Sequence, residues 1–251
     1  MSTQLRKAVR TVRRWMGVVP ASSDFKVVDG SLPSGILNGW QNSKLPERQL
    51  NAFTPILEDM RAGRYREDFL ALSEAIESTG LDDPLIVEIG CASGWNSEVL
   101  ERLLESRVRY VGADYSPGMV ALGRRDYPET PFVVCDAARL PFADESCDIL
   151  LSGTVLLHLF DYRAAIEESR RVAKRFVVFH TVTVQENGDT KVLKKRAYGE
   201  WVIEVVFNES HLRDVFKEVG LEVRRVINSI PYDLIQVTGE HSSTKTFVCE
   251  V

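Results

Sequence analysis

The sequence lacks several features that mark membrane and secreted proteins. It has no run of about 18 or more apolar residues, so we expect no transmembrane helix. Its N-terminus lacks the charged, apolar and small-residue order of a secretory signal. Its four cysteines lie far apart without a C-x-x-C pair, which disfavours a disulfide or zinc framework. We therefore expect a cytoplasmic protein with buried, reduced thiols.

Motifs of two further enzyme classes are also missing. No G-x-S-x-G segment occurs, which disfavours a hydrolase built on a nucleophile elbow. No group of His, Cys, Asp and Glu has the spacing of metal ligands, so we expect no metal site.

Outside the N-terminus, acidic residues outnumber basic ones. The chain has 31 basic and 36 acidic residues, and its formal net charge is -5. Residues 1–19 hold five of the basic residues and no acid, which leaves an acidic body. Such a body disfavours nucleic acid as a partner. In residues 1–19 the apolar side chains share one helical face opposite the arginines. This pattern is open to two interpretations: peripheral contact with an anionic membrane, or a frayed or packed terminal helix.

The order of apolar and polar segments indicates an α/β protein. A length of 251 residues with 44% hydrophobic residues fits one such domain and a modest addition. From residue 84 onward, short apolar strands alternate with helical patterns, which predicts a doubly wound, mostly parallel sheet with helices on both faces. We place an N-terminal helical extension or cap at 1–80 and the catalytic domain at 81–251. Helices are expected at about 47–61 and 64–78, and strands near 85–87, 108–113, 132–134, 149–151, 176–179, 221–228 and 245–250.

Residues 87–94 carry the strongest functional pattern. An apolar strand ends in a glycine-containing turn and a helix follows, and open α/β sheets bind ligands at the carboxyl ends of their strands. A dinucleotide fingerprint aligned on Gly90 needs glycines at two further positions, which Ala92 and Trp95 occupy instead. The spacing therefore disfavours an NAD-dependent oxidoreductase.

The pattern acidic-x-Gly-x-x-x-Gly at residues 88–94 resembles motif I of class I S-adenosylmethionine (SAM)-dependent methyltransferases. It departs from that family at Ala92, where glycine is frequent. Asp114, 20 residues after Gly94, matches the acidic residue that binds the ribose hydroxyls in the family. Residues 134–138 resemble its adenine-binding motif, in which Asp136 would accept from the adenine amino group.

This resemblance implies the fold, the cofactor and the residues that hold it. The expected sheet has seven strands in the order 3-2-1-4-5-7-6, with strand 7 antiparallel. The expected cofactor is S-adenosyl-L-methionine. The implied cofactor-binding residues are Glu88, Gly90, Cys91, Ala92, Gly94, Asp114, Tyr115, Asp136, Ala137 and Ser152.

The methyl acceptor is less well indicated. We expect a small molecule methylated on a hydroxyl, with glycans and lipid-linked molecules among the options, and a SAM-binding domain without catalysis is the alternative. His158 and His180 follow the fourth and fifth strands, so each is a candidate general base, although each could equally be a packed histidine with one backbone bond. Trp40 and Tyr198 each allow two interpretations: the side chain lines the substrate site, or it has only a structural role.

Overall fold

A computed structural model describes residues 25–28, 32 and 35–251. The basic segment 1–19 lies outside these residues, so both interpretations of it stay open. Within the described part of the chain, none of the helices combines the length and the apolar character that a membrane crossing requires.

The N-terminal region forms both expected helices. Its elements are strand β1 (Phe25–Val27), 3-10 helix η3 (Ile36–Gln41), and helices α2 (Leu45–Arg61) and α3 (Glu67–Glu77). A proline at the first turn favours the start of α2, because the missing N–H is unpaired there in any case. Helix α3 buries Phe69, Leu72 and Ile76 against the sheet. The boundary proposed at residue 80 stays a prediction.

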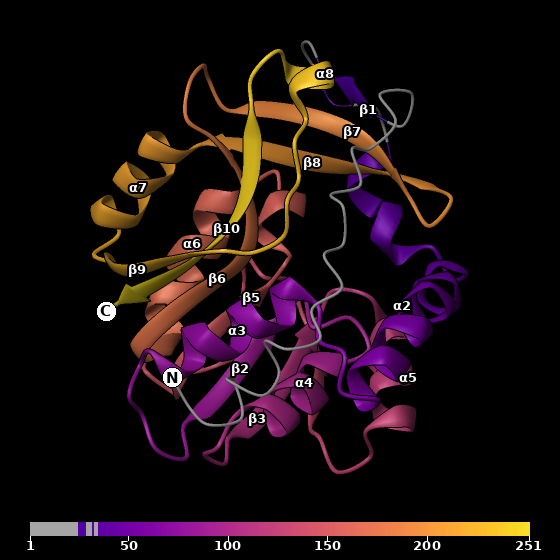
Figure 1. Cartoon of the computed structure of the whole chain (residues 1–251), viewed down its shortest axis with the longest axis vertical. Coiled ribbons are helices and arrows are strands. Elements are labelled where there is room, and N and C mark those ends of the chain that lie inside the picture. Colours follow the sequence, from indigo (N-terminus) through magenta and orange to yellow (C-terminus); the bar gives the residue numbers. More distant parts are fainter. Residues whose placement is uncertain (1–24, 29–31, 33–34) are drawn as a thin grey trace.

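The centre of the molecule is a parallel sheet, as the alternating pattern predicted (Figure 1). Strand β2 pairs with β3 on one side and β5 on the other, β3 pairs with β4, and β5 pairs with β6, all in parallel. The elements are β2 (Leu85–Ile89), α4 (Trp95–Leu103), β3 (Arg109–Asp114), α5 (Pro117–Asp126), β4 (Phe132–Val134), β5 (Cys147–Gly153), η4 (Leu156–His158), α6 (Tyr162–Val172) and β6 (Ala173–Gln185).

The C-terminal half enlarges this sheet. It contains β7 (Lys191–Ala197), β8 (Glu200–Asn208), α7 (Glu209–Glu218), β9 (Glu222–Asn228), α8 (Ile235–Thr238) and β10 (Ser242–Glu250). Strand β10 runs antiparallel to both β6 and β9. Strands β7 and β8 form a hairpin, with β1 on its outer edge, and β8 joins the end of β6.

The described residues therefore form one ten-stranded, mostly parallel sheet. Seven of its strands pair in the order β4-β3-β2-β5-β6-β10-β9 with β10 antiparallel, which is the order that the resemblance implied, and β1, β7 and β8 are additional. The difference arises because β6 extends to Gln185, beyond the end of β5, and its last residues pair with β8. The doubly wound α/β fold itself is confirmed.

Two apolar cores lie on opposite faces of the sheet. One packs α6 and α7 on the sheet and includes the stacked rings of Phe179 and Phe216, whose centroids are 4.6 Å apart. The other packs α3 and α4 around Leu72, Leu100 and Ile149. Each such buried side chain contributes roughly 1.5–3 kcal/mol relative to exposure. These cores fix the strand ends at which the loops that carry the sequence motifs meet.

Candidate active site

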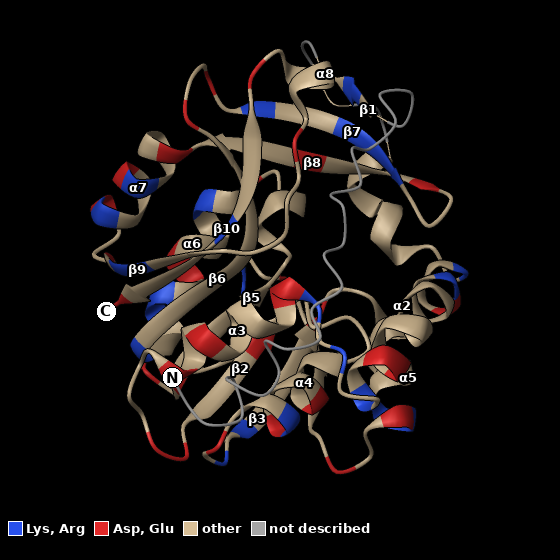
Figure 2. Cartoon of the chain, viewed as in Figure 1, with Lys and Arg blue, Asp and Glu red and all other residues tan. Residues whose placement is uncertain are grey.

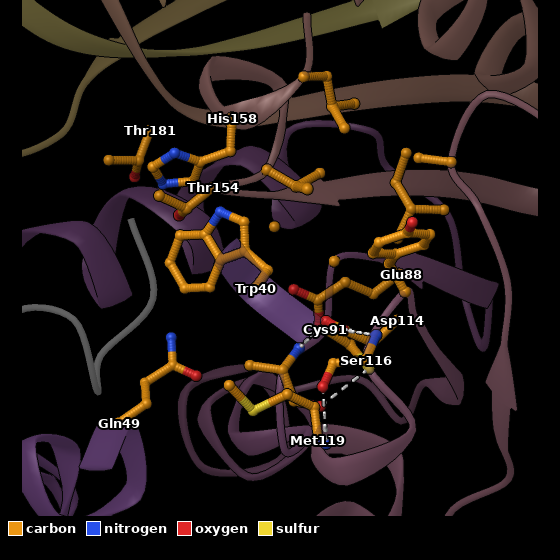
Figure 3. Close-up of a pocket in the computed structure, with 18 of the residues that line it drawn as sticks. Trp40, Gln49, Glu88, Cys91, Asp114, Ser116, Met119, Thr154, His158 and Thr181 are labelled. Carbon is orange, nitrogen blue, oxygen red and sulfur yellow. Dashed lines mark hydrogen bonds between the residues drawn. The ribbon is translucent and has the colours of Figure 1, made fainter. Parts of the chain in front are cut away.

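A cavity of about 810 Å³ lies at the carboxyl ends of the central strands. Figure 3 shows Glu88, Asp114 and Ser116 toward one part of it and Trp40, His158 and Thr181 toward another. We call these parts the Asp114 side and the Trp40 side. The Asp114 side comes from loops after β2, β3 and β4, whereas the Trp40 side includes η3, α2 and the β7–β8 turn. A volume of this size suits a small-molecule site.

The loop after β2 adopts the backbone that its glycines permit. Gly90 and Gly94 have φ angles of 66° and 83°, and Ala92 shares this left-handed region with a φ of 50°. A Cβ at Gly90 would lie 2.3 Å from Cβ of Val155, so no larger residue fits there without a shift. Alanine at position 92 takes an unfavourable conformation that glycine would take freely.

Glu88 is completely buried at the base of this loop. Its Oε1 accepts a hydrogen bond from Nδ2 of Asn96 at 2.7 Å, and its Oε2 accepts one from the hydroxyl of Tyr110. Burial raises the pKa of Glu88 to about 7, and these two hydrogen bonds oppose that rise. The Cα of Gly153 lies so close that a Cβ there would be 1.7 Å from Oε1 of Glu88. This carboxyl group therefore ties β2 to α4 and β3, and packs against Gly153 of β5, while Glu88 lines the cavity.

Asp114 closes the loop from the neighbouring strand. Its Oδ2 accepts from the backbone N–H of Ala92 and its Oδ1 from that of Ser116, each at 2.8 Å. Burial raises the pKa of Asp114 to about 6, against the effect of the two backbone donors. Because each carboxylate oxygen carries two lone pairs, both oxygens can accept one further hydrogen bond.

Most of the cofactor-binding residues implied by the resemblance line the cavity. Beside Glu88 and Asp114, they are Gly90, Cys91, Ala92, Tyr115, Asp136 and Ala137. Gly94 and Ser152 are not among the lining residues. Gly94 precedes the first turn of α4 and packs on the ring of Phe132. Ser152 is buried within β5, and its neighbours Gly153 and Thr154 line the cavity instead.

His158 reaches the cavity from η4, directly after β5. Its Nδ1 lies 2.7 Å from the carbonyl oxygen of Ile203 and must carry the proton of this bond, because a carbonyl only accepts. Burial, reinforced by the charge of Lys195, lowers the pKa of His158 to about 4, so the ring is neutral near pH 7. Nε2 is then an unprotonated acceptor. The ring centroid lies 4.8 Å from that of Trp40.

His180 also lines the cavity, but both of its nitrogens have partners. Nδ1 lies 2.9 Å from the hydroxyl of Thr246, and Nε2 lies 3.1 Å from that of Thr181. Burial lowers the pKa of His180 to about 4. With these partners in place, neither ring nitrogen of His180 is free to accept a proton from a bound molecule.

Several lining residues lie far from the motifs and were not assigned to the site from sequence. They include Gln49 and Phe53 of α2, the bidentate ion pair of Arg66 with Asp68, and Lys195 of β7. No local pattern marks these positions, because packing over long sequence separations brings them to the cavity. Of the two residues left open, Trp40 and Tyr198 both line it, with ring centroids 6.3 Å apart.

Unfavourable backbone conformations are concentrated at this cavity. Six non-glycine residues in the described part of the chain have positive φ angles, and four of them line it: Ala92, Thr154, Thr181 and Tyr198. Each such residue costs of order 1–3 kcal/mol, and such residues are typical of functional sites.

Comparisons with known proteins agree with this geometry. Residues 87–179 match a family model described as a methyltransferase domain. A demethylmenaquinone methyltransferase of Paenarthrobacter aurescens is 34% identical over 89 residues, which are 36% of this chain and 34% of that protein. The chain thus spans about a third of the length of the curated relatives it matches.

Two solved structures share the fold over nearly the whole chain. One is the 1,6-didemethyltoxoflavin-N1-methyltransferase of Burkholderia thailandensis with bound 1,6-didemethyltoxoflavin and S-adenosylhomocysteine, at a TM-score of 0.58 and 12% identity, covering 90% of this chain and 94% of that one. The other is the magnesium protoporphyrin IX methyltransferase of Synechocystis with bound SAM. Its TM-score is 0.58 and its sequence identity 15%, and the match covers 89% of this chain and 99% of that one. Residues 87–179 are thus similar to a methyltransferase domain, and the chain shares the fold of these two methyltransferases.

Proposed function

We propose that this chain transfers the methyl group of SAM to a hydroxyl oxygen of a small molecule. The observation that carries the proposal is the continuity of one cavity. It joins the strand-end carboxylates of the Asp114 side to a neutral histidine, His158, whose Nε2 is free to accept a proton.

The residues of the Asp114 side fit the cofactor. SAM is a cation, and this side presents the carboxyl groups of Glu88, Asp114 and Asp136. The two spare lone pairs of Asp114 suit the ribose hydroxyls, and Asp136 with Ala137 suits the adenine edge. When bound, SAM supplies an electrophilic methyl group on a sulfonium. A Cβ at Gly90 would clash with Val155, and one at Gly153 would clash with Glu88, so the wall of this side is tightly packed at both positions.

The chain contributes alignment and a proton acceptor. Enclosure of both reactants in one cavity would hold the acceptor oxygen in line with the methyl group. When the acceptor oxygen takes the methyl group, the S–CH₃ bond would break, neutral S-adenosylhomocysteine would leave, and the hydroxyl proton would pass to Nε2 of His158. The bond from Nδ1 to the Ile203 carbonyl keeps the ring in the tautomer that this step needs and stabilises the resulting imidazolium. A pKa of about 4 leaves nearly every His158 ring available as a base at pH 7.

Transfer of labelled methyl from SAM to a small-molecule extract tests the proposal. Asn at position 158 keeps a side-chain N–H for the Ile203 carbonyl but removes the distal nitrogen. We expect His158→Asn to lower the transfer rate by roughly 10²–10⁴-fold without changing the affinity for S-adenosylhomocysteine. His211→Gln, on the exposed face of α7, is the matched control and should behave as the wild type. Absence of any labelled product, or full activity of His158→Asn, would contradict the proposal.

A further inference from the structure

Two buried polar atoms on the Trp40 side have no hydrogen-bond partner. They are Nε1 of Trp40 and Oε1 of Gln49, whose residues both line the cavity, and Gln49 is only 8% exposed. Three other side-chain atoms in the described residues are buried without a partner, on Ser73, Ser152 and Gln185, and none of these residues lines the cavity. Buried polar atoms are nearly always paired, so unpaired ones on a cavity wall indicate that a ligand completes them.

The two atoms make opposite demands on that ligand. An indole N–H only donates, and an amide oxygen only accepts. A molecule that satisfies both must offer an oxygen or nitrogen lone pair to Trp40 and an O–H or N–H to Gln49. The ring of Trp40 packs beside His158, so the group that meets Trp40 also lies near the proposed base.

Flat aromatic side chains form much of the surrounding wall. Trp40, Phe53, Phe69 and Tyr198 all line the cavity, and none of them belongs to the strand-end loops. The ring of Phe53 stacks on Trp95 at a centroid distance of 4.1 Å and an interplanar angle of 18°. The guanidinium of Arg66 covers Phe53 at 5.2 Å, which holds this wall in place. Aromatic side chains on a cavity wall favour contact with a planar ring.

The charged residues of the cavity wall help to distinguish an amine acceptor from a hydroxyl acceptor. The Lys and Arg residues that line the cavity are Arg66, Lys195 and Arg196, and the last two belong to β7, a strand rich in basic residues (Figure 2). Asp68 pairs with Arg66, and the buried Glu204 pairs with Lys195 at 2.8 Å. Asp161 is the remaining acidic residue that lines the cavity outside the motif loops, and it offsets Arg196. This wall therefore has no excess of negative charge, so it does not favour a protonated amine and can accommodate a hydroxyl that ionises.

We infer that the Trp40 side binds a planar aromatic molecule with at least two polar substituents, one of them an acidic ring hydroxyl. Trp40 and Gln49 determine its specificity through the N–H and the amide oxygen that the protein leaves unpaired. This inference rests on the proposed function, since it names the substrate class of the same site.

Calorimetric titration of the full chain, saturated with S-adenosylhomocysteine, tests the inference. The ligands are dihydroxynaphthalenes that differ in the spacing of their two hydroxyls, compared with the corresponding saturated decalin diols. We expect at least one dihydroxynaphthalene to bind about tenfold or more tightly than its decalin counterpart. Trp40→Phe keeps an aromatic ring and removes the N–H, and Gln49→Met removes the amide. Each should weaken that binding by about three- to tenfold, the scale of one lost hydrogen bond.

Trp201→Phe is the matched control, because Trp201 lies on β8 and does not line the cavity. It should leave the affinity unchanged. If the chain binds S-adenosylhomocysteine but prefers the decalin diols, or if Trp40→Phe and Gln49→Met bind as the wild type does, the inference is overturned and the proposed function stands. Failure to bind S-adenosylhomocysteine overturns both.

Discussion

Gly153→Ala would disrupt the close contact between Gly153 of β5 and Glu88 of β2. A Cβ at position 153 would lie 1.7 Å from Oε1 and 2.7 Å from Cδ of Glu88, well inside any real contact distance. Glu88 cannot simply swing aside, because it is fully buried and held by Asn96 and Tyr110. The substitution must therefore expel the carboxyl group or separate the two strands.

The cost follows from the bonds that would be lost. Well above pH 7, where Glu88 is ionised, each hydrogen bond to it contributes about 1.5–3 kcal/mol, and the substitution would lose two of them. We expect Gly153→Ala to lower the free energy of unfolding by about 3–5 kcal/mol, a large share of the typical 5–15 kcal/mol. Urea unfolding followed by circular dichroism measures this change.

A double-mutant cycle identifies the cause. In a Glu88→Ala background the carboxyl group is gone and the new methyl group has room. Gly153→Ala should then cost less than about 1 kcal/mol, which leaves a coupling energy of about 2–4 kcal/mol. An equal cost in both backgrounds would refute the steric argument and with it the role of Glu88 as the anchor of this loop.

Two further predictions concern the buried carboxyl groups. Asp114→Ala should weaken SAM binding by about 1–3 kcal/mol in calorimetry, because charge-assisted hydrogen bonds to the ribose are lost; an unchanged affinity would count against the ribose placement. The folded-state pKa of Glu88, about 7, lies above its unfolded value of 4.5, so its contribution to stability is present at low pH and is lost as the pH rises through 7. Glu88→Gln should accordingly gain stability relative to the wild type between pH 5 and about 8 in denaturant titrations, and a pH-independent difference would contradict the raised pKa.

The parts of the site that the sequence predicted are local in the chain. The turn from Gly90 to Gly94 follows from glycines placed after an apolar strand. Asp114 and Asp136 follow the next two strands. Because parallel strands bring their carboxyl ends to one edge, three short motifs were enough to predict this side of the cavity.

The remaining parts depend on contacts between distant segments. Trp40 and Gln49 reach the wall through packing of the N-terminal elements, and Tyr198 reaches it through a hairpin that adds strands to the sheet. The partner of His180, Thr246, is 66 residues away, so no local pattern could show that both ring nitrogens are occupied. The resemblance also implied Ser152 at the end of β5, where Gly153 and Thr154 line the cavity instead.

A crystal structure of the chain with S-adenosylhomocysteine would decide whether the Asp114 side holds an adenosyl group. We predict both ribose hydroxyls within hydrogen-bond distance of the Asp114 carboxylate and the sulfur directed toward His158 and Trp40. Crystals in which this ligand leaves the cavity empty, or in which a dinucleotide places its pyrophosphate on the loop at Gly90, would contradict the cofactor assignment and everything inferred from it.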